Sequence, residues 1–319
     1  MNIIKGLNAL KRPRAGSVVT IGVFDGVHIG HVKVIGGVVK AAKKLKAKSI
    51  VFTFEPHPAK VLHTEVDIPS LMSLAHRIRL IGSLGVDILV IVNFTDAVSG
   101  MSAVEFMENV LVKKAGVKEV HVGDNFYFGR GALAGVAVLK EIARQFSFRV
   151  KIVKPAKVAG RMVSSSLIRS LILSGDIKNA ARLLGRPVSI LGTVVSGARL
   201  ARELGYPTAN INPHHEVIPP RGVYAVLVRF KGKLYEGVLN IGSRPTFYAP
   251  RDQEPTIEVH IFGFKGRIYG MDIEVFFIKK LREEMAFSSK EDLVRQIEKD
   301  SRAARKVLRS VSRKRIKSS

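Results

Sequence analysis

The 319-residue sequence contains no cysteine, which excludes disulfide bonds, zinc–thiolate sites and catalysis by a thiol. It also lacks long apolar runs, because no stretch approaches the roughly 20 apolar residues of a membrane helix. The first residues, MNIIKGLNALKRPR, lack the apolar centre of a signal peptide. We therefore expect a soluble, cytoplasmic protein that does not associate with a membrane.

Acidic residues are scarce relative to basic ones: 26 Asp and Glu accompany 52 Lys and Arg, for a net charge of +26. Such a charge favours an anionic partner, whether a nucleotide, a nucleic acid or an acidic membrane surface, and does not choose among them. After Ser301 there are eight Lys or Arg residues and no acid. The basic surface and a basic tail at residues 309–319 therefore predict weak, salt-dependent binding of nucleic acid.

The chain is long enough for two domains, and its first half alternates short apolar runs with segments of helical periodicity. This alternation predicts a parallel sheet that helices cover on both faces. The expected strands are residues 18–24, 49–54, 87–93, 119–122 and 148–153. The expected helices are residues 31–46, residues 71–84 and a third that begins with a Ser102/Glu105 capping box.

From about residue 185, β-type segments follow one another without helices between them, which favours a small antiparallel barrel. The expected strands are residues 189–195, 222–229, 234–240, 257–262 and 272–281, with a hairpin turn at FKGK, residues 230–233. A Ser288/Glu291 capping box then predicts a final helix of about twenty residues. Leu293, Ile297 and Ala304 are its candidate inward positions.

GVFDGVHIGH, residues 22–31, joins the first expected strand to the first turn of a helix. Ligands bind beyond the carboxyl ends of strands in such folds, and a helix N-terminus favours an anion. His28 and His31 are three residues apart and share one helix face, while Gly30 leaves room for a phosphate chain. The two imidazoles are therefore placed to donate hydrogen bonds to a departing pyrophosphate.

Two other interpretations of this stretch are open. An arbitrary H-x-x-H pair is more often two surface histidines at a helix end. The letters HIGH also occur in class I aminoacyl-tRNA synthetases, but those enzymes need a KMSKS-like loop, which this sequence lacks.

Eight motifs occur in order along the chain: GVFDGVHIGH, FTFEPHP, VGDNFYFG, VSSSLIRSLILSGDIKNAARLLGRP, LGYPTANI, GVYAV, NIGSRPTF and IEVHI. With these motifs, the sequence from about residue 17 to residue 308 resembles the bacterial bifunctional riboflavin kinase and FMN adenylyltransferase family. The resemblance implies an α/β protein in which residues 1–184 form a parallel, doubly wound nucleotidyltransferase domain that joins AMP to FMN to give FAD. Residues 185–308 would form a small antiparallel β-barrel domain with a C-terminal helix that phosphorylates riboflavin. ATP would be the co-substrate and Mg²⁺ the cofactor of both reactions.

In the first domain, the resemblance implies that His28 and His31 hold the ATP phosphates. It implies a wider nucleotide- and phosphate-binding set of Gly22, Phe24, Asp25, Gly30, Asn125, Arg161, Ser164, Ser165, Ser166 and Arg169. Ser166 stands where the family usually has threonine, which keeps the hydroxyl. Serine hydroxyls at a helix start and an arginine fork suit phosphate, although a serine triplet alone is as often an ordinary helix cap. No covalent intermediate is needed, because the FMN phosphate is already an anionic nucleophile.

In the second domain, Thr208 and Asn210 lie two residues apart on one side of an extended segment, where their oxygens suit Mg²⁺, although PTAN alone is usually a turn. The resemblance makes Glu258 the general base for the ribityl hydroxyl, whereas an isolated strand glutamate is normally solvated. It places Arg282 beside the flavin, with a surface salt bridge as the alternative. The implied nucleotide- and flavin-binding set is Gly197, Arg202, Gly205, Pro207, Thr208, Asn210 and Arg282.

The second domain also departs from the family. Leu200 and Ala201 occupy the first two positions of its R-G-R-x-L-G loop, and a methyl at Ala201 costs about 1 kcal/mol if the backbone there is left-handed. Gly263 stands where the family favours aspartate. The efficiency of the kinase is therefore open, and so is a second class of function, a nucleic-acid-binding protein on a decayed nucleotidyltransferase scaffold.

Overall fold

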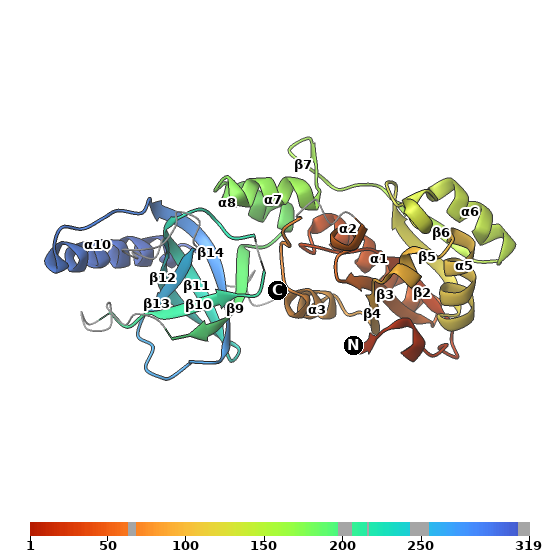
Figure 1. Cartoon of the computed structure of the whole chain (residues 1–319), viewed down its shortest axis with the longest axis horizontal. Helices are drawn as coiled ribbons and strands as arrows, with labels where there is room; N and C mark the ends of the chain where they lie inside the picture. Colours follow the sequence, from red (N-terminus) through yellow and green to blue (C-terminus); the bar gives the residue numbers. More distant parts are fainter. Residues whose placement is uncertain (63–67, 197–205, 216, 243–254, 312–319) are drawn as a thin grey trace. The chain divides into compact units, whose positions relative to one another are not determined.

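The computed structural model describes residues 1–62, 68–196, 206–215, 217–242 and 255–311 (Figure 1). Their contacts divide the chain into two compact units. The first unit comprises residues 1–68 and 74–164, and the second comprises residues 69–73 and 165–319. No helix among the described residues is long and apolar enough to cross a membrane.

The first unit is built on a six-stranded parallel sheet with the order β1-β4-β3-β2-β5-β6 (Figure 1). Its strands are β1 (Asn2–Lys5), β2 (Ser17–Ile21), β3 (Lys48–Glu55), β4 (Ile88–Asn93), β5 (Val117–Gly123) and β6 (Arg149–Val153). The predicted parallel sheet is confirmed, and β1 is an additional four-residue edge strand. The chain runs from β2 outward to β3 and β4 and then crosses to β5, so the strand order reverses between β2 and β5. Ligands bind at such reversals in open α/β sheets.

Helices and short turns connect these strands. They are η1 (Leu7–Ala9), α1 (Ile29–Lys44), α2 (Pro58–Leu62), α3 (Leu74–Ser83), α4 (Asp96–Ser99), α5 (Ala103–Phe106), the π-helix η2 (Met107–Lys114), η3 (Arg130–Ala132) and α6 (Val136–Gln145). A small hairpin of β7 (Lys157–Val158) and β8 (Arg161–Met162) follows β6. The predicted capping box is confirmed, since Ser102 Oγ accepts from the Glu105 amide at 3.2 Å and Glu105 Oε2 accepts from the Ser102 amide at 2.8 Å. The helix expected at residues 71–84 is shorter and spans Leu74–Ser83.

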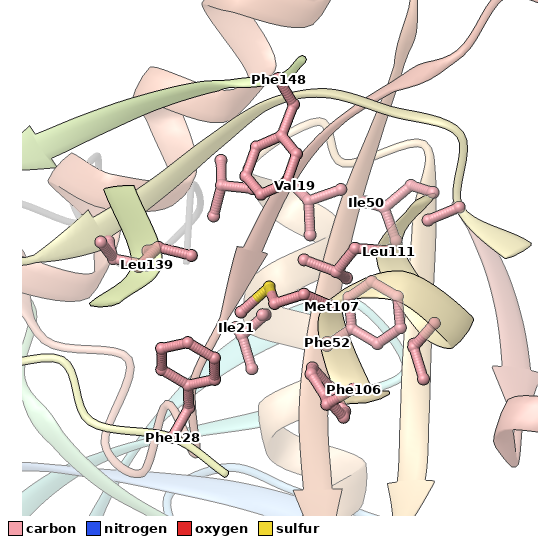
Figure 2. Close-up of a cluster of buried hydrophobic side chains, with 14 of the residues drawn as sticks. Val19, Ile21, Ile50, Phe52, Phe106, Met107, Leu111, Phe128, Leu139 and Phe148 are labelled. Atoms are coloured by element: carbon pink, nitrogen blue, oxygen red, sulfur yellow. The ribbon is translucent and has the colours of Figure 1, made fainter. Parts of the chain in front are cut away.

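Both faces of the sheet are buried, as we predicted for a doubly wound arrangement. Val19 and Ile21 of β2 point into a large cluster with apolar side chains from α5, η2 and α6 (Figure 2). Val18 lies between them in sequence and packs with Val38 and Ala42 of α1 on the opposite face. This alternation, set by the period of two in a strand, explains why all five residues of β2 are buried.

The second unit contains a closed barrel with the strand order β10-β13-β12-β11-β14-β9, whose neighbouring strands are antiparallel. The strands are β9 (Val188–Val195), β10 (Ala209–Pro213), β11 (Gly222–Phe230), β12 (Lys233–Gly242), β13 (Thr256–Ile261) and β14 (Asp272–Arg282). The predicted barrel is confirmed, with β10 as a strand beyond the five expected. Lys231 and Gly232 have φ values of 45° and 75°, which suit the predicted two-residue hairpin turn.

The final helix, α10 (Lys290–Arg309), begins one residue later than its predicted capping box implies. Ser289, and not Ser288, is the N-cap, and its Oγ accepts from the Asp292 amide at 3.1 Å. The sequence SSKED offers both pairs, Ser288 with Glu291 and Ser289 with Asp292, so the pattern alone could not select between them.

Helix α10 packs on β11, β12 and β14 of the barrel. Ala304 and Leu308 are buried in a cluster with side chains of these strands. The inward position of Ala304 is therefore confirmed, while Leu293 and Ile297 are only partly buried.

Two further helices, α7 (Ser165–Leu173) and α8 (Ile177–Leu184), pack on each other, and α8 contacts β9 and β14. Residues 165–184 thus belong by contacts to the second unit. The domain boundary that we predicted between residues 184 and 185 was based on the motifs, and the contacts divide the chain earlier, between residues 164 and 165. That residues 1–184 carry one activity and residues 185–308 the other stays a prediction.

Candidate active sites

The first candidate site begins with an unusual turn after β2. The strand ends at Ile21, before the expected residue 24, because Phe24 has a positive φ of 54°. Val27 is also in the left-handed region, with φ of 37°, and Gly26 between them has φ of 86°. Bulky residues rarely adopt this conformation. The turn makes His28 the N-cap of α1, so the helix starts at Ile29, earlier than the residue 31 we expected.

The two histidines lie together at the start of α1. His28 Nδ1 accepts a hydrogen bond from the His31 amide at 3.3 Å. The rings are stacked, with centroids 3.6 Å apart and planes at 18°, which confirms that they share one face. Because Nδ1 of His28 is an acceptor, the neutral ring carries its proton on Nε2. This nitrogen is a hydrogen-bond donor at a helix N-terminus.

Gly22, Phe24 and Gly30 complete this packed group. The Phe24 ring meets His31 edge-on, with centroids 5.2 Å apart. A Cβ atom on Gly22 would lie 3.0 Å from Cζ of Phe24, and one on Gly30 would lie 3.0 Å from Cε1 of His28. The rings therefore rest on the backbone of the two glycines, which explains the need for glycine at both positions.

Asn125 lies in the exposed turn that follows β5. A Cβ atom on Gly123, the last residue of β5, would be 3.0 Å from Oδ1 of Asn125. Since β2 and β5 are neighbours, this turn and the turn with buried Asp25 leave the same edge of the sheet on either side of the strand-order reversal.

The segment after β6 also approaches the start of α1. Lys33 Nζ donates to the Lys154 carbonyl at 2.9 Å, and a Cβ atom on Gly30 would be 3.9 Å from that of Ala156. The segment continues into β7 and β8, where Arg161 is exposed, and ends at exposed Ser164.

The remaining residues of the phosphate-binding motif lie on α7, in the second unit. Ser165 is the first residue of α7, and Ser166 is exposed one residue later. Arg169 Nε donates to the Pro69 carbonyl at 2.7 Å. The residues of this motif are therefore divided between the two compact units. Arg161 and Ser164 belong to the first unit, and the residues on α7 belong to the second.

The second candidate site is a row of polar residues across the barrel. Asn210 of β10 pairs with Glu258 of β13, which pairs in turn with Asn240 of β12. Residues opposite each other in antiparallel strands project from the same face. Asn240 also pairs with Val223 of β11, and Val223 packs in the cluster that contains residues of α10. The row therefore lies on the outer face of the barrel.

Glu284 extends this row beyond Asn240, and neither residue was among the predicted site residues. A Cβ atom on Gly242 would lie 2.5 Å from Oε1 of Glu284 and 3.0 Å from Nδ2 of Asn240. The Glu284 carboxylate and the Asn240 amide therefore converge over Gly242. Asn240 was visible within the NIGSRPTF motif, whereas nothing in the sequence pattern set Glu284 apart from its neighbours.

The start of the GYPTAN segment is held on both sides. His260 Nδ1 donates to the Pro207 carbonyl at 2.9 Å, since a carbonyl can only accept. Tyr206 Oη donates to Glu298 of α10 at 3.3 Å. Partly buried Thr208 lies between this anchor and β10. Gly197, Arg202 and Gly205, with the divergent Leu200 and Ala201, fall outside the described residues.

Arg282, at the end of β14, forms the salt bridge that was the alternative to its predicted role. Its Nε lies 3.0 Å from Oδ2 and 3.1 Å from Oδ1 of Asp300 on α10, and a second guanidinium nitrogen lies 2.8 Å from Oδ2. Asp300 is buried and also accepts from Gln296 Nε2 at 2.9 Å. Arg282 therefore ties β14 to α10, and its contact with a flavin stays a prediction. Gly263 has φ of 67°, a conformation that favours glycine over the aspartate of the family.

The oxygen atoms near Glu258 suit magnesium. Among the described residues, no group of three or more His, Cys, Asp or Glu is placed to hold a metal ion. Mg²⁺ usually keeps several waters and needs only one or two carboxylates. Asn210 lies directly opposite Glu258, and Thr208 lies two residues before it, so the available donors fit this ion.

Comparisons with known proteins cover both units. Residues 10–167 match a family model described as FAD synthetase, and residues 184–308 match one described as riboflavin kinase. A protein of Buchnera aphidicola subsp. Schizaphis graminum named bifunctional riboflavin kinase/FMN adenylyltransferase is 37% identical over 308 residues, which covers 96% of this chain and 98% of the relative. A Haemophilus influenzae protein of the same name is 37% identical over 306 residues, with 96% and 98% covered.

A solved structure has the same fold over nearly the whole chain. It is described as a macrolide-efflux protein from Streptococcus pneumoniae and matches with a TM-score of 0.83 at 30% identity, covering 98% of this chain and 100% of that one. Its name differs from those of the two relatives above. Both family models instead name flavin reactions.

Proposed function

Because the chain belongs to the family of bifunctional riboflavin kinases/FMN adenylyltransferases, we propose that its first unit transfers AMP from ATP to FMN and that its barrel phosphorylates riboflavin. The observation that carries the proposal is the stacked His28–His31 pair at the start of α1, beside the reversal of strand order. The nucleic-acid-binding alternative on a decayed scaffold is not favoured, since family models for both reactions match the chain.

Adenylyl transfer joins an FMN phosphate oxygen to the α-phosphorus of ATP as the bond from that phosphorus to the pyrophosphate oxygen breaks. Negative charge grows on the departing pyrophosphate, so donors already in place lower the barrier. The Nε2–H of His28, the imidazole of His31 and the N-terminus of α1 would supply those donors. Asn125, Arg161 and Ser164 would bind the nucleotide, and the roles of Ser165, Ser166 and Arg169 stay predictions.

In the kinase reaction, the Glu258 carboxylate would take the proton from the ribityl hydroxyl as the hydroxyl oxygen attacks the γ-phosphorus of ATP. The bond from that phosphorus to the β,γ-bridging oxygen would break at the same time, and ADP would leave. Thr208 and Asn210 would hold Mg²⁺, which when bound would neutralise charge on the phosphates. Asn240, on the other side of Glu258, would orient the carboxylate through its amide. The order of Asn210, Glu258 and Asn240 across β10, β13 and β12 supports this proposed division of roles.

The remaining expectations concern location and partners. We propose a cytoplasmic location, and riboflavin, FMN and ATP as the small-molecule partners. Weak nucleic-acid binding through the basic tail stays a prediction, and residues 312–319 of that tail lie outside the described residues.

The test is to incubate the purified protein with riboflavin, ATP and Mg²⁺ and to separate riboflavin, FMN and FAD by chromatography. The wild type should yield both products, whereas the His28→Ala/His31→Ala variant should accumulate FMN and form FAD only at a small residual rate. His214→Ala, which removes a barrel-surface imidazole hydrogen-bonded to Thr193, is the control and should keep both activities. Absence of both products in the wild type, or equal loss of both in the folded double variant, would contradict the proposal.

A further inference from the structure

Arg77 of α3 is a buried cation, 5% exposed, that the proposed chemistry does not use. One terminal nitrogen donates to the Val23 carbonyl at 3.1 Å, to Thr53 Oγ1 at 3.1 Å and to the Phe54 carbonyl at 2.9 Å. The other terminal nitrogen donates to Glu55 Oε2 at 2.9 Å. All four partners lie at the carboxyl ends of β2 and β3, the edge of the sheet at which the histidines lie.

Thr53 closes this network. Its Oγ1 accepts from Arg77 and donates to the Val23 carbonyl at 2.9 Å. The Val23 carbonyl therefore accepts two hydrogen bonds, which occupies both of its lone pairs. Thr53 is fully buried, and hydrogen bonds are stronger at the low dielectric of a protein interior than in water.

The fixed carbonyl immediately precedes the strained turn. Phe24 and Val27 have φ values of 54° and 37°. Such conformations are unfavourable for these residue types and persist only where the surroundings hold them. The turn sets His28 as the N-cap of α1. The direction of the Val23 carbonyl therefore helps to determine the position of the His28 and His31 imidazoles.

We propose that Arg77, with Thr53, is a positioning residue for adenylyl transfer. It holds the backbone before the turn and thereby aims His28 and His31 at the pyrophosphate. The inference rests on the proposed function of these two histidines. A positioning role differs from a purely structural role in one respect. Loss of Arg77 should slow FAD formation only while His28 and His31 are present.

A double-mutant cycle tests this difference. Arg77→Met is made in the wild type and in the His28→Ala/His31→Ala background, and FAD formation from supplied FMN is followed in long incubations. A misplacement of reacting groups by about 1 Å costs about 10²-fold in rate. We expect a loss of that order in kcat in the wild-type background, little change in KM for FMN, and little further loss without the histidines.

Three controls accompany the cycle. Riboflavin phosphorylation by the same preparations should be unchanged, since the barrel is a separate unit. Arg149→Met removes an ion pair to Glu119, with a 3.0 Å contact, at the amino end of β6, and should leave FAD formation intact. Arg77→Lys keeps the charge without the planar fork and should retain part of the rate.

Equal fold-losses in the two backgrounds, or an unchanged rate in Arg77→Met, would overturn the proposal. Full FAD formation by the histidine double variant itself would instead refute the proposed function of His28 and His31. If Arg77→Met fails to fold, Thr53→Val and Thr53→Ser decide the matter. The valine variant should lose the rate because it lacks the hydroxyl, whereas the serine variant should keep it, and equal rates in both would overturn the inference.

Discussion

Glu258→Gln tests the assignment of the base in the kinase half. Glutamine keeps the size of the side chain but cannot take up the ribityl proton. Asn210 and Asn240 flank Glu258 in register on the adjacent strands, and the glutamine amide can hydrogen-bond in the same row. We therefore expect the barrel to fold normally and only the chemical step to suffer.

The expected loss is large and selective. Removal of a general base typically lowers turnover by about 10²–10⁴-fold, which corresponds to about 3–5 kcal/mol in the activation barrier. FMN formation from riboflavin should fall by this factor at nearly constant KM for riboflavin, because the lost interaction belongs to the transition state. Conversion of supplied FMN to FAD should continue.

Chromatographic assays of the two half-reactions, started separately with riboflavin and with FMN, measure this selectivity. Glu236→Gln is the matched control, since Glu236 lies on β12, pairs with Leu227 and stands four residues before Asn240. It should leave both rates within about twofold, because Glu236 lies four residues from Asn240 along β12 and outside the row of Asn210, Glu258 and Asn240. Wild-type kinase turnover in Glu258→Gln would refute the assignment of the base, and parallel loss of both half-reactions would refute the separation of the two sites.

Three further predictions concern stability and the basic end of the chain. Asp300→Ala should lower the free energy of unfolding by about 3 kcal/mol in urea titrations, because it leaves the Arg282 guanidinium without its carboxylate. Asp300→Asn should lower this free energy by less. An unchanged unfolding midpoint in Asp300→Ala would show that the ion pair with Arg282, closest at 2.8 Å, does not stabilise the fold. Burial lowers the pKa of His121 and its hydrogen bond to Glu119 only partly opposes this, so the unfolded chain binds the proton more readily. The free energy of unfolding should therefore fall as pH drops through the ordinary histidine pKa of about 6.5 and level off below the folded value, and His121→Val should flatten this dependence if His121 is its source. A chain ending at Val311 should release RNA at lower salt than the full chain while keeping both activities. A chain ending at Ser301 should instead unfold the barrel, because it lacks buried Ala304 and Leu308. Unchanged RNA retention by the chain ending at Val311 would place the basic binding surface elsewhere.

Features set by neighbouring residues were predictable from the sequence. The strand–turn–helix character of residues 17–44, the shared face of His28 and His31 and the Lys231–Gly232 turn all follow from spacing and residue type. The exact start of α1 was not predictable, because a β-branched and an aromatic residue in the left-handed region contradict the local preferences of both. Such an exception is expected where the surrounding structure holds a strained functional turn.

Features set by contacts far apart in the sequence were not predictable from residue pattern alone. Arg77 looks like any cation on an amphipathic helix, and its burial depends on Val23 and Thr53, which lie 54 and 24 residues away. Helix α8 likewise carries no local mark that it packs with the barrel. Ser288 and Ser289 show the same limit on a smaller scale, because both pairs satisfied the capping pattern.

The two candidate sites differ in how the chain assembles them, and this difference explains what the sequence could reveal about each. The histidine pair lies on the first turn of one helix, so the three-residue spacing of His28 and His31 is enough to predict that they share a face. The polar row of the barrel is built by register between three strands, of which β13 pairs with the preceding strand β12 and with β10, which lies further away in the sequence. Register has a period of two, so a slip of one residue in β13 would turn Glu258 into the barrel interior and bring Ile257 or Val259 to the row. What places the carboxylate beside Asn210 is therefore the burial of Ile257 and Val259 on the other face, and the apolar neighbours of the base determine its position as much as the polar ones do.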